Sequence, residues 1–309
     1  MPMADNGKTH HTMPSGTLLL VDGTGVAYRA FYAIADLATR DGRPTNAVFG
    51  FVKMLHQLRQ DWKPTHWAVI FDGGTPEARL AALATYKAQR PPMPDPLRSQ
   101  LGLINKFLEL SRVPFLRMDG QEADDVLATL TIRGREAGMD VLIASSDKDL
   151  FQLVGEHVRI VPPSKSGDRM GPSEVREKTG VPPDRIAEWL ALTGDAVDNV
   201  PGVPGVGAKT AAKLLGEFGS LAGIRENLAR VSSPKLREEL NAHWGDVLRN
   251  LEIVTLRTDM EVAVTADDLR VRSPDAGALI PFYEQLEFKT LAEAMRKQHR
   301  EGPMLDLGM

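Results

Sequence analysis

The stretch "TLLLVDG", residues 17–23, decides the fold class of this chain. Its apolar residues run together, as in a strand that is buried on both faces, and an aspartate and a glycine end the run. A helical pattern follows at once, because Val26, Ala30, Ile34 and Leu37 recur on one face of the next segment. A buried strand that leads directly into a helix is typical of a parallel α/β sheet.

The same alternation continues along the first half of the chain. Further strands are predicted for "HWAVIFDG" (66–73), "DVLIASSDKD" (140–149) and "VRIVPP" (158–163). The segments "FGFVKMLHQLRQDW" (49–62) and "RSQLGLINKFLEL" (98–110) have helical stripes. We therefore expect an α/β core with a mostly parallel sheet over residues 16–180.

From residue 181 the pattern becomes helical, and we expect a helical region over 181–290. Glycine or proline breaks separate its segments. Residues 1–15 and 291–309 are expected to be loose tails. The helical segments are "DRIAEWLALTG" (184–194), "AKTAAKLLGEFG" (208–219), "SLAGIRENLAR" (220–230) and "SPKLREELNAHWGDVLRNLEIV" (233–254).

Composition narrows the classes of function. The 309 residues are 42% hydrophobic and 25% charged, as in a globular protein with one large or two ordinary domains. The absence of cysteine excludes disulfides, thiolate metal sites and cysteine nucleophiles. No apolar run could span a bilayer and the opening residues are polar, so we expect a cytoplasmic protein without a membrane partner.

Carboxylates gather at the predicted strand ends. Asp22 and Asp72 end two strands, and Asp147 and Asp149 follow a third. The carboxyl ends of parallel strands face one crevice, so these side chains should converge there. The stretches "MDGQEADDVLATL" (118–130) and "LTGDAVDNVPG" (192–202) extend the cluster to nine carboxylates by adding Glu122, Asp124, Asp125, Asp195 and Asp198.

Each acid also has a simpler interpretation. Asp119 and Glu122 have the spacing of a capping box at a helix start, and the other acids could form turns or caps. Nine clustered carboxylates, however, would raise one another's pKa unless cations neutralised them.

The type of ligand indicates which cation. An all-oxygen set favours Mg²⁺, and the lack of histidine and cysteine in these motifs disfavours zinc. Two ions about 4 Å apart suit phosphodiester hydrolysis. The net charge of −4 argues weakly against a nucleic-acid partner, but the chain is basic once the nine acids are set aside.

Two segments could hold DNA phosphates. In "PGVPGVGAKTAAKLL" (201–215), Gly205 and Gly207 precede a helix start that carries Lys209 and Thr210. Helix amides and a lysine can bind a phosphate there, although a tight turn between helices is the alternative.

The second basic segment covers residues 79–113, which hold six basic residues and two acids. A solvated helix face explains such a segment about as well as a binding surface does. Arg29 follows the first strand beside Phe31 and Tyr32, where an arginine could contact phosphate and a ring could stack on a base. The aromatic residues could equally belong to the core.

The ordered set of motifs resembles the 5′-nuclease family, which includes the 5′→3′ exonuclease domain of bacterial DNA polymerase I and the flap endonucleases. The matching segments run in the family's order over about residues 16–290. They are "LLLVDGTGVAYRAFYA", "AVFGF", "FDG", "TYKAQR", "GQEADDVLATL", "SSDKDLFQLV", "LTGDAVDNVPGVPGVGAKTAAKLL" and "LEFKTL".

The resemblance implies a PIN-like nuclease core with a helical arch at about 79–113 and a helix-three-turn-helix module that binds duplex DNA. The module would commonly hold K⁺. Two Mg²⁺ ions are implied, for which Mn²⁺ can substitute. Asp22, Asp72, Glu122 and Asp124 would surround the first ion, and Asp147, Asp149, Asp195 and Asp198 the second. Asp125 would lie between them or hold waters.

The same resemblance assigns the remaining site residues and the substrate. Lys87 and Arg90 of "TYKAQR" would contact the scissile phosphate, and Arg29 a further phosphate. The implied substrate is DNA with a 5′ flap or 5′ end, or an RNA primer, cut by a monomer near the chromosome, with a DNA polymerase as a candidate partner. In "PEARLAAL" (76–83) the chain departs from the family pattern, because Ala78 and Ala81 replace an aromatic residue and a glutamate.

Two other classes of function remain as alternatives. A non-catalytic module for branched DNA would show gaps in the carboxylate set, and none is present. A PIN-type ribonuclease would not need the "GVPGVGAKTAAK" segment. The 309 residues hold no polymerase region, which leaves a free-standing enzyme, a phage protein and an excised domain open.

Overall fold

A five-stranded parallel sheet forms the centre of this computed structural model, which describes residues 16–164, 167 and 169–301. The strand order is β3-β2-β1-β4-β5. The predicted α/β fold with a mostly parallel sheet is confirmed. The strands are β1 (Thr17–Asp22), β2 (His66–Phe71), β3 (Phe115–Arg117), β4 (Asp140–Ala144) and β5 (Val158–Val161).

Strand β3, which pairs with β2 at the edge of the sheet, was not predicted from the sequence. It has only three residues, and their side chains are half-buried or exposed. A strand this short has no apolar run that could be recognised, and only its pairing with a neighbouring strand identifies it.

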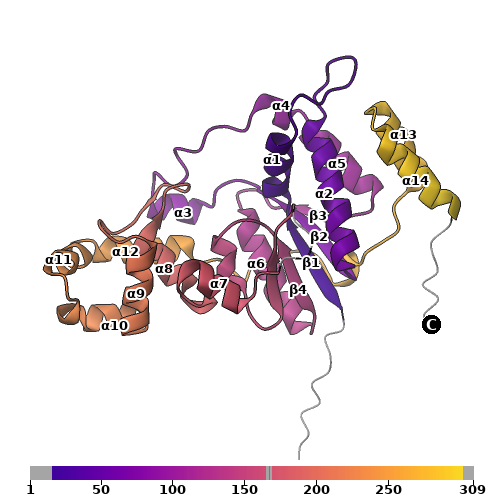
Figure 1. Cartoon of the computed structure of the whole chain (residues 1–309). Coiled ribbons are helices and arrows are strands. Elements are labelled where there is room, and N and C mark those ends of the chain that lie inside the picture. Colours follow the sequence, from indigo (N-terminus) through magenta and orange to yellow (C-terminus); the bar gives the residue numbers. More distant parts are fainter. Residues whose placement is uncertain (1–15, 165–166, 168, 302–309) are drawn as a thin grey trace, which may run out of the picture.

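Helices cover both faces of the sheet, and the alternation of side chains in β1 separates the two layers (Figure 1). Leu19 and Val21 pack into one core layer, while Leu18 and Leu20 pack into the other. The first layer holds α1 (Gly23–Ala33), α2 (Asn46–Trp62), α5 (Leu101–Leu110), α13 (Ala276–Gln285) and α14 (Lys289–Glu301). The second holds α6 (Ala123–Glu136), α7 (Pro172–Thr179) and α8 (Ile186–Thr193).

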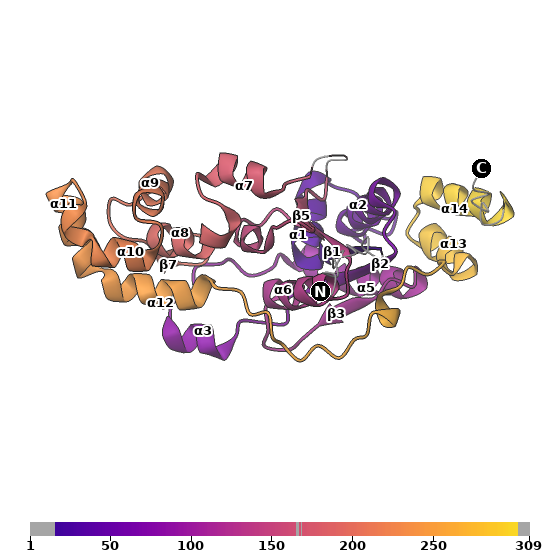
Figure 2. The ribbon, with the colours of Figure 1, turned by 90° about the horizontal axis from the view of Figure 1, so that it is seen from below.

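A helical module continues from α8 and lies at the opposite end of the molecule from α13 and α14 (Figure 2). Its buried residues join the second core layer, so the module is packed continuously onto the sheet. Its elements after α8 are β6 (Gly194–Asp195), β7 (Val200–Pro201), α9 (Ala208–Phe218), α10 (Leu221–Glu226), α11 (Pro234–Ala242) and α12 (Trp244–Val254).

After α12 an extended segment, residues 255–271, runs back along the sheet toward α13 (Figure 2); we call it the strap. Arg133 of α6 donates hydrogen bonds to the carbonyls of Met260 at 2.8 Å and Val262 at 2.7 Å. Near its end, the N–H of Val271 donates to the Thr65 carbonyl at 2.9 Å. The strap therefore fastens the helical module to α6 and to the start of β2.

The single arch predicted for residues 79–113 is too long. The segment contains α3 (Glu77–Ala82) and α4 (Asp95–Arg98), but α5 lies in the first core layer. Ile104, Phe107 and Leu108 of α5 are buried. The basic residues counted in this segment therefore belong to two environments, since Lys106 sits on the exposed face of a core helix.

The prediction of a loose tail from residue 291 is wrong as far as Glu301, because α14 packs against the core. Ala292 and Met295 are buried, and the Phe49 and Phe288 rings meet edge to face at 5.1 Å between centroids. Residues 1–15 and 302–309 lie outside the described residues. Among the described helices, none is long and apolar enough to cross a membrane.

Candidate metal centre and nucleic-acid interface

Two aspartates at strand ends accept hydrogen bonds from neighbouring segments around the site. Asp22 ends β1 and caps α1, since its Oδ1 accepts the N–H of Gly25 at 2.8 Å. Its Oδ2 accepts the Ser145 hydroxyl at 3.1 Å. Asp72 follows β2, and its Oδ1 accepts the N–H of Ala123 at 3.0 Å. Both carboxylates therefore lie at the carboxyl edge of the sheet, next to helix N-termini.

The capping box predicted from Asp119 and Glu122 does not form. Helix α6 begins at Ala123, its N-cap residue is Glu122, and the Glu122 side chain makes no capping bond. The Asp119 side chain is 99% exposed. Asp72 caps the helix from another strand instead, which a reading of the local sequence could not detect. Glu122 is thereby free to face the neighbouring arginine and lysine side chains.

Asp124 lies in the first turn of α6 and, with Asp22 and Asp72, belongs to what we call the first carboxylate group. Burial raises its pKa well above the ordinary value, and the charges of Asp147, Asp22 and Asp72 raise it further. The same causes act on Asp22, where burial, opposed by the Gly25 hydrogen bond, raises the pKa to about 6. These acids therefore lie close enough to repel one another strongly.

A second group contains Asp149, Asp195 and Asp198, and one carboxylate oxygen from each lies within 4.8 Å of the other two. The β6–β7 hairpin brings in the last two. Gly194 opens this hairpin with φ of +69°, and a Cβ there would stand 2.3 Å from the Gly202 nitrogen. The sharp turn therefore requires glycine.

Asn250 of α12 forms hydrogen bonds that join α12 to the hairpin and to α8. This side chain is fully buried, and its amide donates to the carbonyls of Ala191 at 3.2 Å and Pro201 at 2.7 Å. One side chain thus joins the end of α8 to the second strand of the hairpin. Asp195 and Asp198 therefore lie on a hairpin that is hydrogen-bonded to α12.

The second group fits a hard divalent cation. The Oδ1 atom of Asp149 is buried and has no hydrogen-bond partner among the described residues. Burial, followed by the charges of Asp147, Asp195 and Asp198, raises the pKa of Asp149 to about 8. Oxygen ligands are those that Mg²⁺ and similar ions prefer, and an ion would satisfy the unpartnered oxygen. The acids of both groups are thus suited to bind divalent metal.

These raised pKa values predict a pH-dependent stability. A carboxyl whose pKa is higher in the folded state than in the unfolded chain loses its stabilising proton as the pH rises. The metal-free protein should therefore become less stable from about pH 4, through about 6 for Asp22 and about 8 for Asp149. We expect Mg²⁺ to raise the melting temperature more at pH 8 than at pH 5. Thermal melts in EDTA and in Mg²⁺ at both pH values check this, and an equal rise would contradict it.

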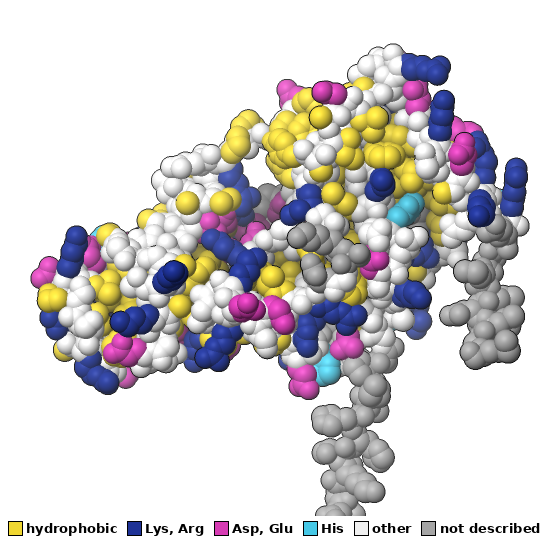
Figure 3. Space-filling model, viewed as in Figure 1, with side chains coloured by type: hydrophobic (Ala, Val, Ile, Leu, Met, Phe, Trp, Pro, Cys, Tyr) yellow, Lys and Arg dark blue, Asp and Glu magenta, His cyan; other side chains and the backbone are white. Residues whose placement is uncertain are grey.

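Basic side chains lie directly against the acids. The Lys87 ammonium contacts Glu122 and lies 3.7 Å from Asp198, and Arg90 forms an ion pair with Asp198. The Lys148 ammonium lies 3.3 Å from Asp195. Figure 3 shows acidic and basic side chains together in a recess beside the chain that joins α3 to α4. Positive charge is therefore available at the edge of the carboxylate pocket.

Tyr86 was not predicted to be a site residue, and Arg79 was predicted only as one basic residue of the segment 79–113. Tyr86 is 5% exposed, and its hydroxyl lies 3.1 Å from Asp198 Oδ2 and 3.3 Å from Glu122 Oε2. Burial, with the charge of Asp198, raises the pKa of this tyrosine, so it stays protonated and can donate. The one available signal was its place in "TYKAQR", directly before Lys87.

Asp125 does not share the position of its neighbour Asp124. It is fully buried, and its Oδ1 accepts from Arg79 Nη2 at 2.8 Å and from the N–H of Arg257 at 3.0 Å. In this structure its hydrogen-bond partners are Arg79 and the strap, and the expectation that it lies between the two metals or holds waters stays a prediction.

Arg29, which was predicted to contact a phosphate, lies on the exposed surface. Arg29 donates to the hydroxyls of Ser146 at 2.7 Å and Ser164 at 3.0 Å, which ties α1 to the loops after β4 and β5. The two aromatic residues beside it differ. Phe31 packs against the first core layer, whereas Tyr32 is 71% exposed. Only Tyr32 is thus available for stacking on a base.

The segment predicted to bind phosphate opens α9. Gly205 has φ of +79°, and Gly207 is the N-cap residue of the helix. Both glycines and Lys209 are exposed, and Thr210 is half-buried. The first turn of α9 has no acid, so both its N–H groups and the Lys209 ammonium favour a negatively charged ligand there.

Comparison with known proteins gives consistent matches. Residues 17–180 match the family model described as "5'-3' exonuclease, N-terminal resolvase-like domain", and residues 181–277 match "5'-3' exonuclease, C-terminal SAM fold". A 5′-3′ exonuclease of Aquifex aeolicus is 38% identical over 291 residues, which cover 94% of this chain and 99% of that protein.

Two further matches extend the comparison. The thermostable DNA polymerase I of Thermus filiformis is 42% identical over 90% of this chain, which spans only 33% of that polymerase. A structure of T5 5′-exonuclease with bound divalent metal ions (zinc) superposes with a TM-score of 0.65. It is 26% identical and covers 78% of this chain and 90% of its own.

Proposed function

This chain belongs to the 5′-3′ exonuclease family, and from that premise we propose that it is a metal-dependent, structure-specific 5′ nuclease. It would hydrolyse phosphodiesters of DNA at a 5′ end or 5′ flap. The observation that carries the proposal is the carboxylate pocket, in which acids from five separate segments converge beside Lys87 and Arg90. Removal of RNA primers and displaced flaps in replication and repair is the proposed role.

The two groups of acids support two metal sites. Asp22, Asp72, Glu122 and Asp124 would hold one ion, and Asp147, Asp149, Asp195 and Asp198 the other. Mg²⁺ is the proposed ion, with Mn²⁺ as a substitute. When bound, two such ions activate water and stabilise charge on the attacking and leaving oxygens. K⁺ is proposed for the turn before α9.

The chain's own residues would orient the substrate. Lys87 and Arg90 border the acids and could contact the scissile phosphate as the carboxylates take up metal, because both already lie at contact distance from the pocket. Their positive charge would stabilise the phosphate in the transition state. Arg29, with its two serine contacts, is proposed for a neighbouring phosphate.

Duplex binding is proposed for the start of α9. Gly205 and Gly207 would let the backbone approach a phosphate, and Lys209 and Thr210 would bind its oxygens. The whole enzyme would act as a monomer near the chromosome. The relatives named DNA polymerase I make a polymerase the proposed partner.

Lys209→Ala tests this assignment. A lysine that contacts a phosphate contributes counterion release, so its loss should weaken flap binding about equally for all sequences and lower the salt slope by about 1. Fluorescence anisotropy of a flap duplex in Ca²⁺ at several salt concentrations measures both. Lys235→Ala on α11 is the matched control, since that lysine is exposed on the far part of the module. An unchanged salt slope would remove Lys209 from the interface.

The function itself is tested by cleavage of a 5′-labelled flap duplex in Mg²⁺ and in EDTA. Metal-dependent cutting near the junction is expected. Tight flap binding without cutting would favour the non-catalytic module, and cutting of RNA in preference to DNA would favour the PIN-type ribonuclease.

A further inference from the structure

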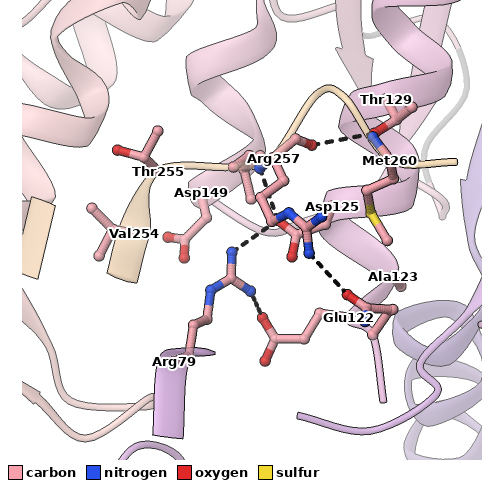
Figure 4. A network of polar contacts seen from close by, with 12 residues as sticks. Arg79, Glu122, Ala123, Asp125, Thr129, Asp149, Val254, Thr255, Arg257 and Met260 are labelled. Atoms are coloured by element: carbon pink, nitrogen blue, oxygen red, sulfur yellow. Dashed lines mark hydrogen bonds and ion pairs between the residues drawn. The ribbon is translucent and has the colours of Figure 1, made fainter. Parts of the chain in front are cut away.

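Two adjacent acids of α6 face different partners, and Figure 4 shows Asp125 turned toward Arg79 and Arg257. Successive residues of a helix point about 100° apart. Asp124 therefore lies among the metal-site carboxylates, while Asp125 turns toward Arg79 and Arg257. Asp125 is fully buried, and its second oxygen has no hydrogen-bond partner among the described residues. The charge of Asp125 thus depends on Arg79 for neutralisation.

Arg79 reaches two acids at once, which its forked side chain allows. One guanidinium nitrogen contacts Glu122, and the other donates to Asp125 at 2.8 Å. The Arg79 side chain is 9% exposed, so both pairs are shielded from water. Burial is the largest single influence and lowers the pKa of Arg79, but the charge and hydrogen bond of Asp125, together with the charges of Tyr86 and Asp124, raise that pKa overall. A lysine lacks the planar fork of nitrogens, so it could not reproduce these two separate contacts in the same geometry.

Three segments that are distant in sequence meet at this arginine. Arg79 lies on α3, directly before the turn that carries Tyr86 and Lys87. Asp125 also accepts the N–H of Arg257 in the strap, and the Arg257 guanidinium donates to the Gln121 side chain at 3.3 Å. The first turn of α6 is therefore held from the arch side and from the strap side.

We infer that Arg79 is a positioning residue for the metal centre. It binds Glu122 and Asp125 and thereby fixes the position of the first turn of α6. This turn carries Asp124 and follows directly on Glu122. The role of Asp125 is to bind Arg79 from the buried side of the helix, and not to bind metal or water. The kinetic part of this inference rests on the proposed nuclease function; the metal-binding part does not. Residues that orient metal ligands typically change metal affinity or activity by about 10 to 100-fold when replaced.

The test compares Arg79→Lys, Asp125→Asn and the double variant in the full chain. Each single variant should weaken Mn²⁺ binding to the DNA-free protein by about 10-fold or more, measured by electron paramagnetic resonance. The Mg²⁺ concentration for half-maximal cleavage should rise in step, with flap affinity in Ca²⁺ unchanged. The double variant should lose no more Mn²⁺ affinity than the weaker-binding single variant, because both substitutions break the same contact.

Arg133→Lys is the matched control. Arg133 also ties α6 to the strap, through the Met260 and Val262 carbonyls, but it contacts no acid of the site. It should lower the melting temperature and leave Mn²⁺ binding unchanged. If it weakens Mn²⁺ binding as much as Arg79→Lys does, general loosening explains the effect and the inference fails.

Two other results would overturn the inference. One is Mn²⁺ binding at the unmodified level in Arg79→Lys. The other is slower cleavage by Asp125→Asn at saturating Mg²⁺ with unchanged Mn²⁺ affinity. In that case Asp125 would act in the chemical step. Should one variant fail to fold by circular dichroism, the other single variant decides. An unmodified protein that binds Mn²⁺ but cuts no flap would refute the proposed function alone.

Discussion

Replacing Asp195 by asparagine is expected to slow flap cleavage about a thousand-fold even at saturating Mg²⁺, while leaving flap affinity within about two-fold. Asp195 belongs to the group in which one carboxylate oxygen from each acid lies within 4.8 Å of the other two, and it is 6% exposed. An amide keeps the shape of the side chain but removes one negative charge from the ion's surroundings. Losing on the order of 4 kcal/mol of transition-state stabilisation corresponds to about a thousand-fold in rate.

Single-turnover cleavage and anisotropy in Ca²⁺ measure the two quantities for Asp195→Asn. Asp119→Asn is the matched control, since Asp119 is an aspartate with a 99% exposed side chain just before α6, outside the pocket. The control should cut at the unmodified rate. Equal loss of rate and of affinity in Asp195→Asn would mean that Asp195 supports DNA binding rather than the chemical step.

Replacing Lys87 by methionine is expected to slow cleavage by about 100 to 1,000-fold at saturating DNA, as for the loss of one donor that faces developing charge. The Lys87 side chain is 13% exposed and lies between Glu122 and Asp198. Its backbone adopts φ of 56°, and its N–H donates to the Asp198 carbonyl at 2.9 Å. The side chain is therefore held at the pocket by the backbone turn.

The measurement for Lys87→Met is the single-turnover rate, with flap affinity determined separately. Lys106→Met serves as the control, because Lys106 pairs with Glu109 on the surface of α5, away from the acids. Methionine keeps the aliphatic stem, so the comparison isolates the charge. A variant that binds the flap weakly but cuts at the normal rate would assign Lys87 to ground-state binding instead.

Much of the fold was predictable because its signals are local. The apolar run before Asp22 and the stripe of α1 both depend on neighbours within one turn or one strand, so pattern alone identified them. The convergence of Asp22 and Asp72 also followed from sequence, since parallel strands place their carboxyl ends at one edge. The parallel sheet is confirmed, and the residue roles at the site stay predictions.

The errors have a common cause. The capping box at Asp119 has the right spacing, but Asp72 occupies the capping position from another strand. Residues after 291 are polar enough to suggest a tail, yet Ala292 and Met295 are buried against the core. Each error concerns a contact whose partner lies far away along the chain.

By itself, the sequence determined the fold class, the order of the motifs and the set of acids that could bind metal, because periodicity and strand ends are properties of adjacent residues. Only the tertiary structure decided which acid faces which partner. Asp124 and Asp125 are neighbours of identical chemistry, and a 100° turn of the helix separates the metal pocket from Arg79. That choice depends on α3 and on the strap, which meet α6 only after the chain has folded.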